Sequence, residues 1–363
     1  MKKEMRIGDF LTITRGASPR PISKYVTSDD NGINWIKIGD VDPNSFYITK
    51  TEEKITEEGA KKSRYVKEGD FILSNSMSFG RPYILKINGC VHDGWLILSD
   101  YDKTVIPSYL YYLLRSPTVQ SQFDGSANGS TVRNLNSDLV RNVVVNIHTD
   151  KTEQQSISSQ LDTIQKAIDT KTSELSLLDE AVKSEFVEMF GENPVESSKW
   201  KVAKWADKVR ITNGRDYKKL VVKTGLYPVY GSGGDMGIRV DDYLCSENTV
   251  IIGRKGNIDK PIFVKEKFWN VDTAFGLNVD ESEINPYYFF EHSKKYNYRS
   301  MDTGVTIPSL TKTALFELKL AIPPLDLQNQ FAAFVQQIDK SKFVLHQQLQ
   351  FTEKYAIMFK EIK

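Results

Sequence analysis

An internal duplication limits the folds open to this sequence more than any other feature. At a shift of 179 positions the chain matches itself without a gap through the middle of each half. The shift changes to 175 at Gly129 and to 174 at Gln154, where loops are expected. Because repeated sequence folds into repeated structure, both halves are predicted to share one fold. The pairs matched at the first shift are Glu68 with Glu247, Pro82 with Pro261, Asp93 with Asp272, Leu98 with Leu277, Pro107 with Pro286 and Tyr109 with Tyr288.

The first part of each repeat is predicted to be globular. Residues 1–150 and 192–322 contain short β-branched runs separated by Gly and Pro, a pattern typical of strands joined by turns. Pro107 and Pro286 each open a run of apolar and aromatic residues, which indicates a helix with proline in its first turn. The fold class predicted for both parts is therefore mixed α/β (α+β).

The second part of each repeat, residues 151–191 and 323–363, is predicted to be one long helix. Its apolar residues recur alternately four and three positions apart, as in a heptad seam. A helix of about 38 residues is roughly 57 Å long, which favours an antiparallel coiled coil over two helices that each pack on their own globular part. Equal repeats joined in this way predict a pseudo-twofold arrangement. The predicted packing residues are Ile157, Leu161, Ile164, Ile168, Leu175, Leu178, Val182, Phe331, Val335, Ile338, Leu345 and Leu349.

Composition and charge narrow the class of protein. The 363 residues fit two or three domains, and 40% of them are apolar, which is enough for a sizeable core. Lys and Arg number 48 against 47 Asp and Glu, so the net charge is +1. This balance argues against a simple basic nucleic-acid-binding protein. If DNA is the ligand, partner subunits are expected to supply much of the contact with its backbone.

The sequence predicts a cytoplasmic protein that does not enter a membrane. No apolar run approaches the ~20 residues that span a bilayer. The N-terminus has no apolar region of the kind found in signal peptides. Cys90 and Cys245 are the only cysteines, and their separation supports neither a disulfide framework nor a zinc site. They fit a reducing compartment.

Signals for catalysis and for bound cofactors are weak. The four histidines share no metal-binding spacing, and His148 and His346 are expected on solvated surfaces. The glycine-rich stretch 231–237 is out of register with a dinucleotide-binding motif and is interpreted as a loop. The stretch 193–196 shares only its first two residues with an amino-methyltransferase tetrapeptide and is interpreted as a linker. No catalytic residue, metal ligand or cofactor site is predicted in this chain.

Polar loops at equivalent places in the two repeats are the candidate binding residues. The stretches 74–82 and 253–261 each follow a predicted strand, and 15–21 and 213–219 come early in each globular part. Their side chains suit contacts with base edges and phosphates, although ordinary surface turns and strand-edge hydrogen bonds are the alternative interpretation. Arg254 is the strongest single candidate. The full set is Arg15, Ser18, Arg20, Asn75, Ser76, Ser78, Arg81, Asn128, Thr131, Arg133, Asn213, Arg215, Tyr217, Lys218, Arg254, Lys255, Asn257 and Thr306.

The layout resembles the specificity subunit of type I restriction–modification systems. Globular part and long helix alternate twice, and Ile322-Pro323-Pro324-Leu325-Asp326-Leu327-Gln328 leads into the last helix. The stretches 250–258 and 14–20 are similar to parts of the target recognition domains of that family. Two departures affect only the helix entries. Residues 147–154 keep Glu-Gln but lack Pro-Pro-Leu, and Leu327 stands where glutamate is usual.

The resemblance implies a DNA-recognition protein with no catalytic activity of its own. Residues 1–150 and 192–322 would be two target recognition domains, each of which reads half of a bipartite, asymmetric sequence in double-stranded DNA. Residues 151–191 and 323–363 would be the conserved regions that hold them apart. Two modification subunits, which carry S-adenosylmethionine and methylate adenine, would dock on this chain. ATP-dependent restriction subunits, which cleave DNA, would then join the complex.

Two other classes of function stay open from the residues alone. A stand-alone nuclease or methyltransferase would need a catalytic constellation, and we find none in the sequence. A coiled-coil scaffold that does not bind DNA would fit the near-zero net charge. Sequence-selective DNA binding in the presence of modification subunits separates these alternatives from the resemblance.

Helix length is predicted to set the spacing between the two half-sites. Inserting one heptad in both long helices would move the globular parts about 10 Å farther apart. That distance corresponds to roughly three base pairs at ~3.4 Å each. The measurement is the methylation pattern of a folded variant, and unchanged spacing would contradict the prediction.

Overall fold

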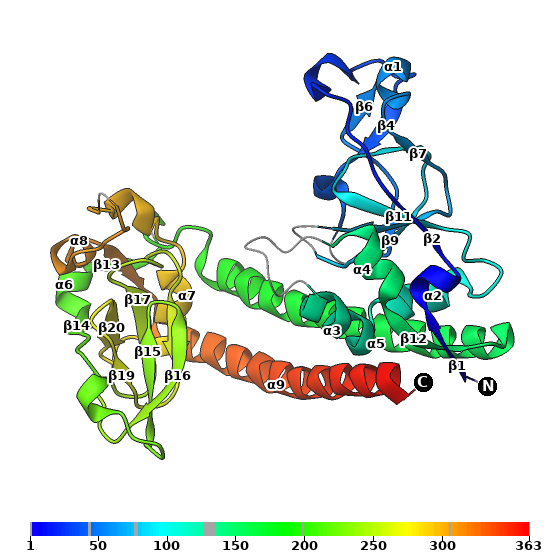
Figure 1. Cartoon of the computed structure of the whole chain (residues 1–363). Coiled ribbons are helices and arrows are strands. Elements are labelled where there is room, and N and C mark those ends of the chain that lie inside the picture. The colour runs from blue at the N-terminus through cyan, green and yellow to red at the C-terminus, as the bar shows by residue number, and fades with distance from the viewer. Residues whose placement is uncertain are drawn as a thin grey trace. The chain divides into compact units, whose positions relative to one another are not determined.

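The computed structural model describes residues 2–42, 45–75, 79–126, 135–197, 199–304 and 306–362, with side chains described as far as residue 357. The chain divides into two compact units (Figure 1). Unit 1 contains residues 1–171 and 348–363, and unit 2 contains residues 172–347. Each unit therefore combines one globular part with portions of both long helices, α5 (Lys151–Phe190) and α9 (Leu325–Ile362).

The globular part of unit 1 is built on two five-stranded sheets and a short strand pair. The first sheet has the order β2-β11-β8-β9-β5 and the second has the order β3-β6-β4-β10-β7. The strands are β1 (Lys2–Arg6), β2 (Thr12–Arg15), β3 (Val26–Thr27), β4 (Ile33–Ile36), β5 (Tyr47–Ile48), β6 (Glu53–Ile55), β7 (Arg64–Val66), β8 (Phe71–Ser74), β9 (Pro82–Leu85), β10 (Gly89–Val91), β11 (Trp95–Ser99) and β12 (Val144–His148). The helices are α1 (Glu57–Ala60), α2 (Pro107–Leu114), α3 (Pro117–Ser126) and α4 (Ser137–Asn142).

The globular part of unit 2 repeats this plan, but its sheets have fewer strands, four and three instead of five and five. Its orders are β14-β20-β17-β18 and β16-β15-β19, and β13 pairs with β21 as β1 pairs with β12. The strands are β13 (Lys201–Lys204), β14 (Val209–Asn213), β15 (Tyr227–Gly231), β16 (Gly234–Val240), β17 (Thr249–Gly253), β18 (Ile262–Val264), β19 (Trp269–Asn270), β20 (Ala274–Val279) and β21 (Lys319–Ile322). The helices are α6 (Trp205–Lys208), α7 (Pro286–Ser293) and α8 (Lys312–Phe316).

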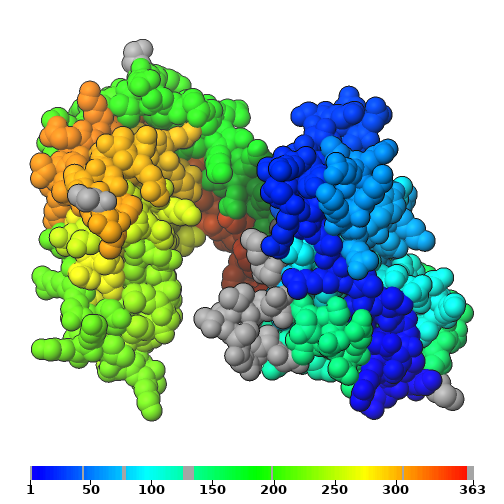
Figure 2. All heavy atoms as spheres, turned by 45° about the horizontal axis from the view of Figure 1, so that its top comes forward, coloured from blue at the N-terminus to red at the C-terminus, as the bar shows by residue number. Residues whose placement is uncertain are grey.

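The predicted duplication and mixed α/β fold are confirmed. Helices α2 and α7 both begin at the matched prolines, Pro107 and Pro286. The strand sequence β2-β11-β8-β9 of the first sheet corresponds to β14-β20-β17-β18. A long helix follows each globular part. Each unit has several clusters of buried apolar side chains, and one cluster in each unit also includes residues of α5. Figure 2 shows one outer face of the side chains that surround these clusters.

The two long helices serve both of the roles considered from the sequence. In unit 1, Ile157 and Leu161 of α5 belong to the core of the globular part. In unit 2, Phe186 of α5 and Phe331 of α9 belong to the second core, with ring centroids 5.5 Å apart. Between these ends the helices pair antiparallel, because Lys342 bonds Asp179 at 2.5 Å and Lys171 bonds Gln348 at 2.7 Å.

A buried glutamine fastens α5 to the globular part of unit 1. The side chain of Gln154 is completely buried. Its Nε2 donates to the carbonyl oxygens of Thr104 at 3.0 Å and His148 at 2.7 Å, and its Oε1 accepts the N–H of Ile106 at 2.9 Å. His148 is only 4% exposed, so its expected place on a solvated surface was wrong. His148 ends β12 and lies before the first turn of α5.

The matched glutamine of unit 2 makes the same three bonds. Gln328 is also completely buried. Its Nε2 donates to the carbonyl oxygens of Glu283 at 3.1 Å and Pro323 at 2.8 Å, and its Oε1 accepts the N–H of Asn285 at 2.8 Å. These two clamps therefore do not depend on the Pro-Pro-Leu sequence, which only the second helix entry contains.

No helix among the described residues is both long enough and apolar enough to cross a membrane.

Replacing Gln154 by Ala is expected to lower the free energy of unfolding by about 2–4 kcal/mol, because the buried carbonyl of His148 and the partly buried carbonyl of Thr104 and N–H of Ile106 lose their partner. Urea denaturation measures the loss, and hydrogen exchange at the amide of Ile106 should accelerate. Gln155 lies on the exposed side of the same turn. Its change to Ala is the matched control, with an expected effect within about 0.5 kcal/mol. Equal effects of the two substitutions would contradict the clamp.

Candidate nucleic-acid interface

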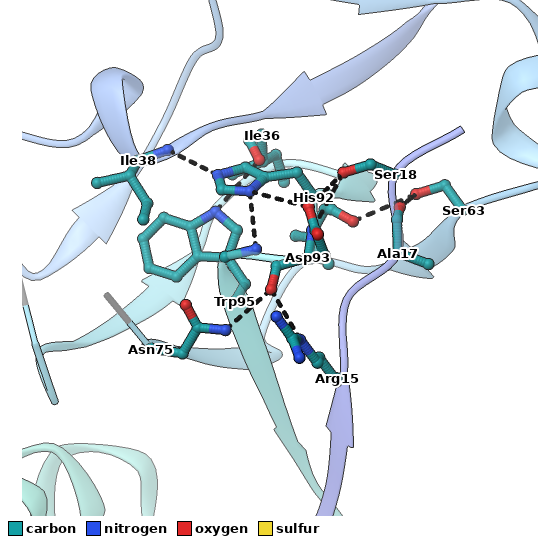
Figure 3. Close-up of polar contacts among 12 residues, drawn as sticks. Arg15, Ala17, Ser18, Ile36, Ile38, Ser63, Asn75, His92, Asp93 and Trp95 are labelled. Atoms are coloured by element: carbon teal, nitrogen blue, oxygen red, sulfur yellow. Dashed lines mark hydrogen bonds and ion pairs between the residues drawn. The ribbon is translucent and has the colours of Figure 1, made fainter. Parts of the chain in front are cut away.

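Four of the predicted polar residues of unit 1 converge on one aspartate in the loop after β10, residues 92–94, which we call the anchor loop. Figure 3 shows three of them, Arg15, Ser18 and Asn75, around Asp93. The backbone oxygen of Asp93 accepts Arg15 Nε at 3.0 Å and Asn75 Nδ2 at 2.9 Å. Its carboxylate accepts Ser18 Oγ at 2.7 Å and pairs with Arg20 Nη2 at 3.5 Å. The ends of β2 and β8 and the segment 15–20 are thereby held together at one edge of the sheet.

The electrostatics of the anchor loop keep its aspartate ionised. The hydrogen bond from Ser18 lowers the pKa of the Asp93 carboxyl below its usual value. Burial lowers the pKa of the adjacent His92, whose Nδ1 accepts the backbone N–H of Gly94 at 2.8 Å. At neutral pH the loop therefore combines a carboxylate with a neutral imidazole, and the charge of Asp93 is available to hold Ser18 and Arg20 in place.

A glycine in each unit allows the chain to pass close to the anchor loop. A Cβ atom on Gly16 would lie 2.1 Å from the carbonyl oxygen of His92. One on Gly214 would lie 1.8 Å from the carbonyl oxygen of Val271, in the equivalent loop of unit 2, residues 271–273. Any other residue would clash with the backbone at these two positions. This requirement for glycine is visible in two matching sequences, Ile13-Thr14-Arg15-Gly16 and Ile211-Thr212-Asn213-Gly214. A comparison of the halves at a shift of 179 does not align them.

The strongest sequence candidate, Arg254, occupies in unit 2 the place of Asn75. The N–H of Arg254 donates to Thr273 O at 2.8 Å, as that of Asn75 donates to Gly94 O at 3.0 Å. Its Nη1 lies 3.4 Å from Asp272 O, and its guanidinium lies 5.9 Å from the ring centre of Phe275. The side chain is exposed, so it is open to a ligand.

Two further segments join the same edge of unit 2. The N–H of Gly256 donates to Pro308 O at 2.9 Å, which brings the stretch around Thr306 beside residues 254–257. The tip of the β15–β16 hairpin lies next to Asn257, whose Nδ2 is 3.7 Å from the Cβ position of Gly233. The prediction that the glycine-rich stretch 231–237 is a loop was therefore wrong for most of it, because Gly231 ends β15, residues 234–237 belong to β16, and only residues 232–233 form the turn.

The remaining predicted residues fall into three groups. Arg81 lies opposite Ser74 in the hairpin that contains Asn75, with its N–H 3.0 Å from Ser74 Oγ. Tyr217 is partly buried and packs on the core around Val229. The other predicted residues of unit 2 are exposed, namely Asn213, Arg215, Lys218, Lys255, Asn257 and Thr306. Ser76, Ser78, Asn128, Thr131 and Arg133 lie outside the described residues.

Sequence reasoning did not assign a role to the anchor loops. Asp93 and Asp272 were already paired by the duplication, but their neighbours come from distant parts of each unit. In the portion of the chain that the structure describes, no three His, Cys, Asp or Glu side chains gather as a metal site requires.

The comparisons with known proteins agree with this arrangement. Residues 2–179 and 197–351 match the family model of the type I restriction modification DNA specificity domain. The chain is 22% identical to the type I restriction enzyme MjaIX specificity subunit of Methanocaldococcus jannaschii, over 91% of this chain and 85% of that one.

Two solved structures share the fold over nearly the whole chain. The S subunit of the type I restriction–modification system of M. genitalium has a TM-score of 0.59 at 14% identity, covering 99% of this chain and 95% of that one. A chain from a structural study of the complex assembly and conformational transition of the type I system has a TM-score of 0.60 at 12% identity, covering 99% and 96%.

The duplicated fold, with an edge of polar loops on each globular part, is that of a type I S subunit. This chain belongs to the family of type I restriction–modification DNA specificity proteins, because the family model matches both repeats. The resemblance deduced from the sequence is thereby confirmed, and the chain's role is DNA sequence recognition. The scaffold and stand-alone enzyme alternatives have no support.

Replacing Arg254 by Ala is expected to weaken recognition of one half-site only, by roughly 1–3 kcal/mol if the guanidinium reads a guanine. The measurement is affinity for cognate DNA and for duplexes altered in one half-site. Lys319 is exposed on β21, which leads into α9, and its change to Ala is the control. Unchanged affinity and preference would show that this loop is only a turn.

Proposed function

We propose that this chain reads a bipartite, asymmetric sequence in double-stranded DNA, with one half-site for each globular part. The supporting observation is an exchange of side chains between equivalent positions. At the end of the first edge strand, Arg15 of unit 1 corresponds to Asn213 of unit 2, since they pair with Leu96 and Phe275 in matched registers.

At the second position, after the central strand, the asparagine is in unit 1 and the arginine is in unit 2. After the central strand, Asn75 of unit 1 corresponds to Arg254 of unit 2. Arginine is suited to guanine and asparagine to adenine in the major groove. Two backbones of the same plan therefore carry the same two residue types at reversed positions. Arg15, Asn213 and Arg254 are exposed, whereas Asn75 is buried and its amide holds the anchor loop. The side chains open to DNA therefore differ between the two globular parts, which supports the recognition of a different sequence by each half.

The chemistry is assigned to partner subunits. Two modification subunits, which bind S-adenosylmethionine, would methylate adenine in each half-site, and restriction subunits would cleave the DNA. The docking of partners is supported by the part of α9 that lies in unit 2, where the adjacent Phe343 and Val344 are 64% and 49% exposed. Large apolar side chains on the exposed face of a helix are typical of a surface that another protein covers. Such a complex would act in the cytoplasm and would bind no cofactor on this chain.

The domain boundaries proposed are those expected from the sequence. Residues 1–150 and 192–322 would be the target recognition domains, and residues 151–191 and 323–363 the conserved regions. Helices α5 and α9 begin and end within two residues of these limits.

Exchange of one target recognition domain tests the proposal. Replacing residues 1–150 by the matching domain of a relative should change one half-site of the methylated sequence and leave the other intact, because each globular part carries its own anchor loop. The reciprocal control replaces residues 192–322 and should change the other half-site. Sequencing of methylated adenines reads out both variants, and a change in both half-sites after either exchange would overturn the proposal.

A further inference from the structure

We propose that Arg81 and Arg115 of unit 1 form a subsite for one backbone phosphate of the bound DNA, separate from the residues that read bases. This inference rests on the proposed function, since it assigns a second kind of contact to the same interface. Arg115 was not among the residues that the sequence suggested.

The phosphate subsite lies beside the edge of unit 1 that the anchor loop holds together. Ser74 and Arg81 face each other in the hairpin between β8 and β9, with Ser74 N–H donating to Arg81 O at 3.0 Å. Asn75, which donates to the anchor loop, is the next residue after Ser74. A phosphate contact at this place would fix the position of the duplex while the neighbouring side chains read its bases.

A cavity of about 420 Å³ places the two guanidinium groups on one hollow. Its described lining consists of Phe79, Gly80, Arg81, Arg115 and Gln120. Two arginines on one hollow are well suited to the oxygens of a phosphate, because each guanidinium is planar and permanently charged.

The positive field at the cavity reaches both neighbouring tyrosines. Burial raises the pKa values of Tyr83 and Tyr111, whereas Arg81 and Arg115 oppose that rise in each case. Asp42 partly offsets the two cations at Tyr83. The hydroxyl of Tyr83, which is 1% exposed, has no hydrogen-bond partner among the described residues.

Packing against an aromatic ring holds Arg115 in place. Its Nη1 donates to the hydroxyl of Tyr111, and its guanidinium lies 5.3 Å from the centre of that ring. Arg115 caps the C-terminal end of α2, where the helix dipole favours a cation. A fixed guanidinium loses less conformational entropy when it binds an anion than a free one does.

Unit 2 has lysines at the positions of the two arginines, but a glutamate neutralises one of these lysines. The shift of 179 places Lys260 on Arg81 and Lys294 on Arg115. Lys294 Nζ, however, pairs with Glu291 Oε1 at 2.6 Å and lies 4.0 Å from the ring centre of Phe290. The inference therefore concerns unit 1, and Lys294 provides a matched control at the equivalent position.

The salt dependence of DNA binding tests the inference. The complex of this chain with its modification subunits is titrated with a duplex that carries the methylated sequence, at several salt concentrations. Arg115→Ala should reduce the slope of log K against log[salt] by about 0.9, the value for one phosphate, and should weaken binding to all duplexes alike. Arg81→Ala should have the same effect.

Three controls separate charge from structure. Arg115→Lys keeps the charge, and Tyr111→Phe removes the hydroxyl that positions Arg115 while keeping its guanidinium, so both should retain the wild-type slope. Lys294→Ala should also leave the slope unchanged. Loss of slope in Tyr111→Phe with no loss in Arg115→Ala would overturn the inference, because the effect would then come from packing.

Neutral phosphate analogues locate the contact. Single methylphosphonate substitutions are placed along the duplex, and one position should weaken the wild type but leave Arg115→Ala unaffected. Equal sensitivity of wild type and variant at every position, with an unchanged salt slope, would overturn this inference alone. A wild-type complex that bound all duplexes alike would overturn the proposed function, and the phosphate subsite with it.

Discussion

The rest of the structure depends on the buried glutamine at each helix entry. Gln154 and Gln328 each satisfy one backbone N–H and two backbone carbonyls that come from the strand end and from the loop before α2 or α7. Buried groups of this kind are costly to leave unpaired, so the first turn of each long helix is fixed to its globular part. Ile157 and Phe331 then continue the two cores into the helices.

The anchor loops have a related structural role at the candidate DNA-binding edge of each globular part. Their backbone carbonyls hold the strand ends, and Gly16 and Gly214 are required because the chain passes within contact distance of the loop. The backbone is thus constrained in the same way in both units. The side chains at the edge are not, since Arg15 and Asn75 of unit 1 are replaced by Asn213 and Arg254 of unit 2. The two units therefore share a constant backbone frame and differ in the polar side chains that it carries.

The sequence predicts the repeated elements well because a duplication compares the chain with itself. The matched prolines predict the first residues of α2 and α7, and the heptad spacing predicts both long helices. Periodicity does not identify what covers an apolar stripe, so the packing of Ile157 in the globular core corresponds to the alternative that the sequence favoured less. His148 was placed at the surface because its burial depends on Gln154 and on Tyr109, whose ring centroid lies 6.2 Å away. The role of Asp93 depends on Ser18, which is 75 residues distant, and no local pattern reports such a contact.

The central claim is that two similar globular parts in one chain read two different half-sites. It is tested most directly by single-molecule sequencing of methylated adenines in cells that express this chain with its modification subunits and in matched cells that lack the chain. The account predicts methylation that depends on the chain and is confined to one motif, composed of two different specified blocks separated by a stretch of unspecified bases. Methylation of one continuous motif, or of two identical half-sites, would contradict it.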